Sequence, residues 1–153
     1  MSFMNGKVLL DANVLVYSYD RSDLAKQRQA EETLHALAFA GRGAVSTQIL
    51  GEFFTTVIRK LAQTLSLEDA CREVAHHAQT WTVYSVTSRV VLEAVRGVRE
   101  HQLNYWDAQI WAVARLNQIP VVWSEDFSEG TVLEGVRFVN PLGPAFRVTD
   151  WIK

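Results

Sequence analysis

Two spacings of apolar residues alternate along the chain. Short, mostly apolar runs predict buried strands, and these runs stand at Val8–Leu10, Ala44–Ser46, Thr82–Tyr84, Val121–Trp123 and Val136–Val139. Between them, apolar residues recur every three or four positions among charged ones, which predicts helices over 13–17, 22–39, 47–61, 66–78, 91–101 and 107–116. Strands separated by helices need crossover connections and therefore pair in parallel. The predicted fold class is α/β, a three-layer α/β/α sandwich around a central, mostly parallel sheet.

Polar residues and glycines mark several helix ends. Ser66 and Asp69 match the Ser-x-x-Asp pattern that begins a helix, and Ser46 or Thr47 can cap the helix that precedes it. Gly41 predicts the end of the helix over 22–39. The tail over 143–153 has no clear periodicity, but we expect its large apolar side chains to pack on the rest of the chain: Phe146, Val148, Trp151 and Ile152.

Composition limits the class of protein. The 153 residues, 48% hydrophobic and 21% charged, fit one domain spanning residues 1–153. No segment approaches the roughly 20 uninterrupted apolar residues of a membrane helix, and residues 1–7 lack the pattern of an export signal. The single cysteine, Cys71, permits no internal disulfide and no cysteine-based zinc site of the usual four-ligand kind, so we expect a cytoplasmic protein. A formal net charge of -2 means that nucleic-acid binding would need a local basic patch or bound cations.

Four carboxylates stand where simple solvation does not explain them. Asp11 and Asp126 come at or just after predicted strand ends, where open parallel sheets place their ligand sites. Asp107 and Glu52 lie on predicted helices beside apolar positions. Several carboxylates close together would raise one another's pKa unless a cation joined them, and oxygen ligands alone favour Mg²⁺ or Mn²⁺. Such an ion can activate a water and balance charge on a phosphate, which is the chemistry of phosphodiester hydrolysis.

Three of these four carboxylates also have a simpler interpretation, whereas Glu52 is the hardest to explain as structure. Asp11 and Asp107 can cap or begin helices, and Asp126 can be an ordinary turn residue. Trp106, beside Asp107, is either a core residue or a platform on which a base stacks. The histidines show no shared spacing that would bring them to one metal, and we interpret all four as surface or packing residues: His35, His76, His77 and His101.

Four blocks of sequence carry the acids. They are Val-Leu-Leu-Asp-Ala-Asn-Val-Leu-Val-Tyr at 8–17, Ser-Thr-Gln-Ile-Leu-Gly-Glu-Phe-Phe at 46–54, Asn-Tyr-Trp-Asp-Ala-Gln-Ile at 104–110 and Ser-Glu-Asp-Phe at 124–127. Together and in this order they resemble a PIN domain, close to the VapC-like toxins, over about residues 8–139. The resemblance implies that an Mg²⁺ or Mn²⁺ ion is held by four catalytic acids: Asp11, Glu52, Asp107 and Asp126.

The resemblance assigns further roles and partners. It implies that Asn13 and Ser124 orient the acids by hydrogen bonds, while Glu125 and Glu129 stay open as acids that share or replace the role of Asp126. It also implies an RNA substrate, a homodimer, and a small antitoxin protein that blocks the site and can insert an Arg among the acids. The expected function is therefore that of a metal-dependent endoribonuclease, the toxin of a toxin–antitoxin pair.

Three other functions remain as alternatives. PIN nucleases also act in RNA maturation, and a PIN fold without activity can bind RNA or protein. A phosphotransferase with an aspartyl-phosphate also places an Asp after its first strand, but such enzymes resemble Asp-x-Asp there, whereas this chain has Asp11 and Asn13. Loss of metal-dependent RNA cleavage on replacing Asp11 distinguishes the nuclease from the last two.

Overall fold

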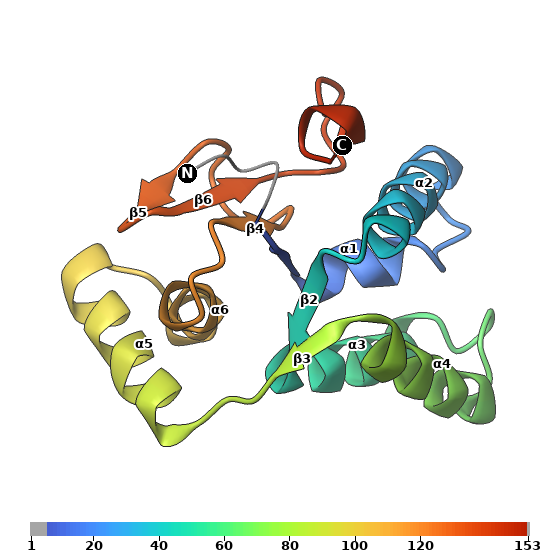
Figure 1. Ribbon diagram of the computed structural model, residues 1–153. Helices are drawn as coiled ribbons and strands as arrows, with labels where there is room; N and C mark the ends of the chain where they lie inside the picture. The colour runs from blue at the N-terminus through green and yellow to red at the C-terminus, as the bar shows by residue number, and fades with distance from the viewer. Residues whose placement is uncertain (1–5, 153) are drawn as a thin grey trace.

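A six-stranded sheet forms the centre of the computed structural model, which describes residues 6–152 (Figure 1). The strands are β1 (Val8–Leu10), β2 (Gly43–Ser46), β3 (Thr82–Tyr84), β4 (Val121–Trp123), β5 (Val132–Leu133) and β6 (Val136–Val139). Their order across the sheet is β3-β2-β1-β4-β6-β5, and every neighbouring pair is parallel except β5 with β6. The mostly parallel sheet confirms the predicted fold class.

Strand order reverses direction at β1. The chain moves from β1 to β2 and β3 on one side, then returns to place β4 on the other side of β1. The two strands pair with Leu10 opposite Trp123, so their carboxyl ends lie next to each other. In open α/β sheets the crevice at such a reversal is where ligands bind.

Helices cover both faces of this sheet. They are α1 (Ala12–Tyr17), α2 (Leu24–Ala40), α3 (Thr47–Lys60), α4 (Leu67–Thr80), α5 (Ser88–His101) and α6 (Tyr105–Leu116), followed by a short 3-10 helix, η2 (Val148–Asp150). Figure 1 shows α5 and α6 together on one side of the strands, with α1 and α2 on the other. No helix within residues 6–152 combines the length and the apolar character needed to cross a membrane.

The expected helix signals act as caps. Ser46 accepts a hydrogen bond from the Ile49 amide at 3.2 Å and begins α3. Ser66 and Asp69 bond reciprocally in a capping box at the start of α4. Gly41 ends α2 with φ 67, a left-handed conformation that glycine adopts without steric cost.

The core is apolar, and the tail packs on it. Leu9, Phe53, Trp111 and Trp123 are among its largest fully buried side chains. Phe146 stands edge-on to Trp123, with ring centroids 5.2 Å apart, and Val148, Trp151 and Ile152 also pack against the core. The expectation that the tail docks is confirmed. The expectation that the first residues carry no export signal falls largely on residues 1–5, which lie outside the described part of the chain, as does Lys153.

The structure departs from the sequence pattern at three places. Strand β5 was not predicted, and it forms a hairpin with β6 through Glu134 and Gly135, which have φ 49 and φ 86. On α4 the inward position is His77 rather than Ala78. On α5 the apolar residues that predicted the helix are 37–70% exposed to solvent: Val91, Leu92, Val95 and Val98. The buried face of α5 is formed instead by Val90, Ala94 and Gly97.

Candidate metal centre

Asp11 occupies the reversal point of the sheet. It follows β1 directly and is the N-cap of α1, with one oxygen accepting a hydrogen bond from the Ala12 amide at 2.7 Å. Its other oxygen accepts from the Ser124 hydroxyl at 2.6 Å. The side chain is only 4% exposed, and this burial raises the pKa of Asp11 from 3.8 to about 6 against the lowering effect of both hydrogen bonds. Asp11 therefore caps α1, as its simpler interpretation predicts, and is at the same time a buried acid at the sheet edge where ligand sites lie.

Ser124 connects the ends of β1 and β4. Its buried hydroxyl donates to Asp11 and accepts from the backbone amide of Asp126 at 3.1 Å. The Asn13 amide group lies 3.5 Å from the same oxygen, and its carbonyl accepts from the Glu125 amide at 3.4 Å. The segment that carries Asp126 is thus held against the start of α1. Ser124 bonds the carboxylate of Asp11 directly, whereas Asn13 bonds Ser124 and the Glu125 backbone and no acid, so the orienting roles of both residues stay predictions.

A cavity of about 310 Å³ opens beside these residues. Asp11, Glu52 and Asp126 all line it, so the structure brings three of the four predicted acids to one space. The negative charges of Asp126 and Glu52 both contribute to raising the pKa of Asp11, which indicates that the three carboxylates interact.

Asp107 does not line that cavity, but its carboxylate interacts with the charge of Asp126, which does. It is the third residue of α6, where its amide donates to the Asn104 side chain at 3.0 Å and its carboxylate accepts from the same side chain at 2.6 Å. Desolvation raises the pKa of Asp107, with a further contribution from the charge of Asp126. Asp107 thus approaches the cluster through Asp126, and it combines a first-turn helix position with a place near the other acids.

The chemistry of this donor set fits Mg²⁺ or Mn²⁺. All four candidate ligands are carboxylates, one of them buried with a raised pKa that a cation would relieve. Within residues 6–152, no three of these acids bring oxygens within 4.8 Å of one another. That spread suits Mg²⁺, which binds through one or two carboxylates and keeps several waters. The ligand roles themselves remain predictions.

The two acids left open by the sequence have other partners. Glu125 forms a 2.5 Å ion pair with Lys26 of α2, whose ammonium also lies over the Tyr17 ring, 4.7 Å from its centroid. Glu129 accepts a 2.6 Å hydrogen bond from the Asn140 amide. Glu125 also lines the cavity, but its charge is paired with Lys26, which favours Asp126 as the acid available to a cation there.

Sequence reasoning missed the polar side chains around Glu52. Gln48 donates to Glu52 at 2.7 Å, and Gln109 donates to Gln48 at 2.7 Å from the facing helix. Two signals were available: Gln48 precedes Glu52 by four positions, which places both on one helix face, and Gln109 is a polar residue inside an apolar stretch. Lys60 and Thr56, on the same face of α3, also line the cavity.

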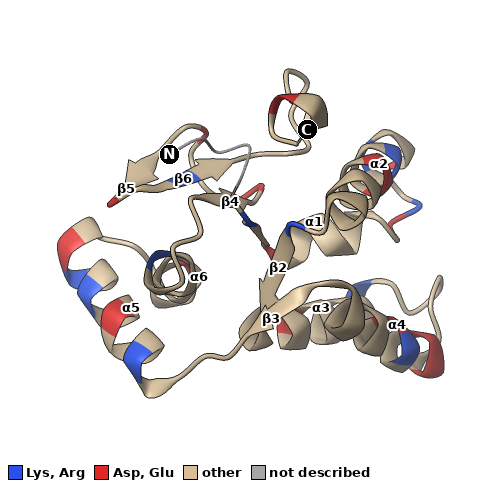
Figure 2. Ribbon diagram, in the orientation of Figure 1, with Lys and Arg blue, Asp and Glu red and all other residues tan. Residues whose placement is uncertain are grey.

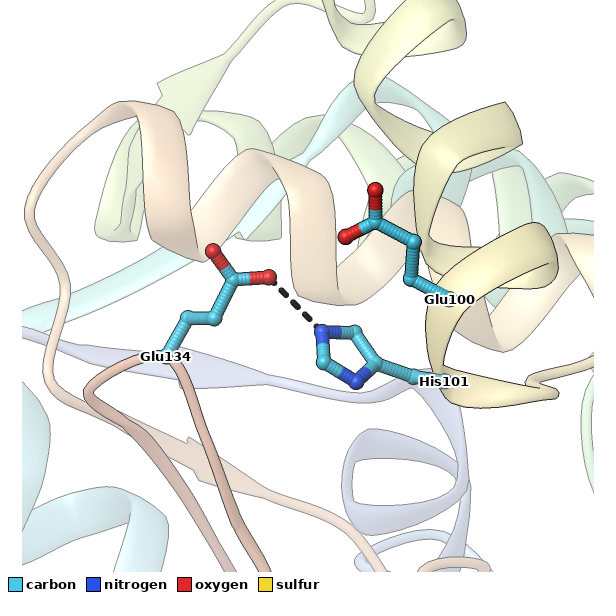
Figure 3. Close-up of side chains that lie close together, drawn as sticks. All are labelled: Glu100, His101 and Glu134. Atoms are coloured by element: carbon cyan, nitrogen blue, oxygen red, sulfur yellow. Dashed lines mark hydrogen bonds and ion pairs between the residues drawn. The ribbon is translucent and has the colours of Figure 1, made fainter.

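A second cluster of titratable groups lies elsewhere, between α5 and the β5–β6 turn. Figure 3 shows Glu100, His101 and Glu134 close together, and each offers a ligand atom within 4.8 Å of the others. His101 contacts Glu134 at 2.7 Å, but Glu134 also pairs with Arg96 at 2.9 Å and Arg115 at 3.2 Å. Hydrogen bonds from Arg96 and then His101 lower the pKa of Glu134 to about 2. The arginines already supply the positive charge that balances Glu134, so we interpret the cluster as an ion-pair network and not as a metal site. Figure 2 shows the acidic and basic residues that alternate along α5.

Comparison with solved structures identifies the fold. A chain of a toxin-antitoxin complex from Klebsiella pneumoniae is 20% identical, with a TM-score of 0.65 over 88% of this chain and 98% of that chain. VapC20 of Mycobacterium tuberculosis, described as a sarcin-ricin loop cleaving toxin, is 21% identical, with a TM-score of 0.66 over 86% and 99%. A DNA-bound VapBC structure from Salmonella typhimurium is 16% identical, with a TM-score of 0.61 over 89% and 98%.

Sequence comparison gives the family. No curated protein sequence matches the chain. The family model described as PIN domain matches residues 8–128, a span that contains β1, helices α1 to α6, β4 and the four candidate acids. The match and the shared fold agree with the resemblance of the four sequence blocks. The chain belongs to the PIN domain family.

Proposed function

We propose that this chain is a metal-dependent endoribonuclease that hydrolyses RNA phosphodiester bonds, and that it is the toxin of a toxin–antitoxin pair. The observation that carries the proposal is the buried carboxylate of Asp11, whose pKa of about 6 reflects burial together with the charges of Asp126 and Glu52. Such an arrangement is costly for folding alone, whereas a divalent cation compensates it. PIN nucleases in general use divalent metals.

The residues of the chain divide the work. Asp11 and Asp126 would hold Mg²⁺ or Mn²⁺ directly or through water, with Glu52 and Asp107 completing the negative site. When bound, the ion lowers the pKa of an attacking water and balances the charge that develops on the phosphate. Ser124 keeps Asp11 oriented and fixes the backbone that carries Asp126. Lys26 neutralises Glu125, which reduces the repulsion that an RNA phosphate would meet at the cavity.

Cleavage of a mixed RNA pool tests the nuclease. Wild type is expected to cut with Mg²⁺ or Mn²⁺ and not with EDTA, and Asp11→Asn is expected to abolish cutting while the chain stays folded. Asp150→Asn is the matched control, because Asp150 is exposed on η2 and is not among the residues that line the cavity. Equal cutting by wild type and Asp11→Asn would refute the role of Asp11, and a wild type inactive on every RNA would favour a PIN fold used for binding.

An antitoxin partner is the second half of the proposal. The similar structures include a toxin-antitoxin complex and a VapBC complex, which supports a small protein partner for this chain. Co-purification with a short protein encoded beside it, together with loss of RNA cleavage in that complex, is the expected result. Harmless overexpression of the active chain alone would contradict the toxin role. Light scattering on the isolated chain tests the homodimer that we also propose.

A further inference from the structure

A row of hydrogen bonds runs from α6 to α3 and ends on Glu52. The Tyr105 hydroxyl donates to Oε1 of Gln109 at 2.7 Å. Nε2 of Gln109 donates to Oε1 of Gln48 at 2.7 Å, and Nε2 of Gln48 donates to Oε1 of Glu52 at 2.7 Å. Four side chains from two helices therefore form one continuous relay that reaches the acid-lined cavity.

The direction of this relay follows from its last member. An ionised carboxylate only accepts hydrogen bonds, so the atom of Gln48 that faces Glu52 must be its nitrogen. The oxygen of Gln48 then faces α6, where only the nitrogen of Gln109 can serve it. The remaining oxygen of Gln109 requires a donor, and the Tyr105 hydroxyl provides one. Both amide orientations are thus set by the charge on Glu52.

The burial of Gln109 indicates that these hydrogen bonds are not an incidental surface network. Gln109 is 5% exposed and stands in an unbroken buried stretch of α6, from Ala108 to Ala114. A buried amide costs free energy unless its polar atoms are bonded, and an apolar side chain would fill the same space without that cost. The second hydrogen of the Gln48 nitrogen reaches the Trp106 carbonyl at 3.4 Å, next to Asp107. The relay thus joins the helix that carries Glu52 to the turn that carries Asp107.

We propose that Gln48 and Gln109 are positioning residues that hold the Glu52 carboxylate for a divalent cation. This inference rests on the proposed role of Glu52. Gln48 engages Oε1 of Glu52, while no hydrogen bond within residues 6–152 reaches Oε2. Oε2 therefore has no protein donor in the described part of the chain and is the oxygen open to a cation at the cavity that Glu52 lines. Outer hydrogen bonds of this kind fix the rotamer of a ligand, and their loss typically lowers metal affinity about 10- to 100-fold.

Two substitutions of Gln109 separate positioning from packing. Gln109→Glu keeps the shape but replaces the donor by an acceptor, so the Gln48 amide must turn its nitrogen toward α6 and its oxygen toward Glu52. Gln109→Met removes the anchor without adding charge. Gln63→Glu, on an exposed turn, is the control for added charge, and Gln48→Met tests the same relay from α3 if a Gln109 variant fails to fold.

The measurement is MnCl₂ binding to the full chain by titration calorimetry, without RNA. The Mn²⁺ dissociation constant is expected to rise about 10- to 100-fold in Gln109→Glu and Gln109→Met, and to stay unchanged in Gln63→Glu. In a Glu52→Gln background, Gln109→Met is expected to have no further effect, because Gln109 acts through Glu52. A purely structural Gln109 would lower the melting temperature equally in both backgrounds and leave Mn²⁺ affinity unchanged.

The possible failures are distinguishable. Folded Gln109 and Gln48 variants that bind Mn²⁺ like wild type, while Glu52→Gln binds it more weakly, would overturn the positioning role and leave the role of Glu52 intact. Unchanged Mn²⁺ affinity in Glu52→Gln would overturn both. Neither result decides whether the chain cleaves RNA, which rests on the separate comparison of wild type with Asp11→Asn.

Discussion

Replacing Asp11 by Asn is expected to stabilise the cation-free protein while it removes the activity. Asn has nearly the same shape but only one acceptor oxygen, so it keeps the bond from Ser124 or the one from the Ala12 amide, and it carries no charge into a site that is 4% exposed. Because the pKa of Asp11 rises from 3.8 to about 6 on folding, the ionised side chain costs the fold about 3 kcal/mol at pH 8. The lost hydrogen bond offsets about 1 kcal/mol of this gain. The remaining stabilisation of about 2 kcal/mol corresponds, for a chain of this length, to a melting temperature about 4–8 °C higher in the variant.

The sign of the pH dependence follows from the same numbers. The pKa of Asp11 is higher in the folded chain than in the unfolded chain, so its neutral form favours folding. This stability is fully present below pH 3.8 and is lost as the pH rises through about 6. Between pH 8 and pH 5, wild type recovers about 1.4 kcal/mol of the cost.

The contribution of His77 to stability changes with pH in the opposite direction to that of Asp11, so the measurement must separate the two. Burial lowers the pKa of His77 from 6.5 to about 4, so this residue destabilises the fold as the pH falls below 6.5. The same His77 is present in wild type and in Asp11→Asn. The difference in unfolding free energy between the two proteins therefore isolates the contribution of Asp11.

Urea unfolding in EDTA at pH 5 and pH 8 measures this difference, with Asp150→Asn as the control for loss of an exposed carboxylate. The advantage of Asp11→Asn over wild type is expected to be about 1.4 kcal/mol larger at pH 8 than at pH 5. An equal advantage at the two pH values, or a less stable variant at pH 8, would refute the reasoning from burial.

Three further substitutions test other parts of the structure. Ser124→Ala removes a hydrogen bond that lowers the pKa of Asp11, so the acid limb of the pH–rate profile is expected to move to higher pH. Trp106→Ala is expected to weaken RNA binding by about 1–3 kcal/mol, measured by fluorescence anisotropy, because this side chain is 61% exposed beside the acids and can stack a base. Gly97→Ala would place a Cβ 2.8 Å from the Trp111 ring, so urea unfolding should reveal a loss of about 1–3 kcal/mol.

Each of these expectations has a clear contrary result. An unchanged pH–rate profile in Ser124→Ala would mean that its hydroxyl does not tune Asp11. Trp106→Ala with wild-type RNA affinity would make Trp106 an ordinary exposed side chain. Wild-type stability in Gly97→Ala would mean that α5 and α6 move apart at little cost, with Gly51→Ala as the control because a Cβ there meets nothing within 4 Å.

The features of the fold that could be predicted from the sequence depend on residues close together along the chain. Strand β1 passes into α1 at Asp11 because a buried apolar run ends at a residue that caps helices well, and both signals lie within a few positions. The inward face of α5 was not predictable in this way. Its valines and Leu92 define helical spacing, but the side that packs is decided by Trp111 of α6, which needs the space that Gly97 leaves.

In the candidate site, too, local features could be predicted from the sequence and long-range contacts could not. Asp11 and Asp126 were placed at strand ends by sequence alone, but their proximity depends on β4 returning to the side of β1, which no local pattern specifies. The relay through Gln109 depends on a partner 61 positions away, at Gln48. Long-range hydrogen bonds of this kind leave only a weak local trace, a polar residue among apolar ones.

The shortness of the two outer strands limits how this protein can meet other proteins. One border of the sheet is β3, with three residues, and the other is β5, with two residues, whose turn is tied to α5 by Arg96 and Glu134. An added strand needs a long row of free backbone groups, and neither border offers one. Association by shared sheets, including the edge-to-edge pairing that leads to aggregation, is therefore disfavoured. Within residues 6–152, side chains on helices and loops are therefore the surfaces more open to a partner than the strand borders are.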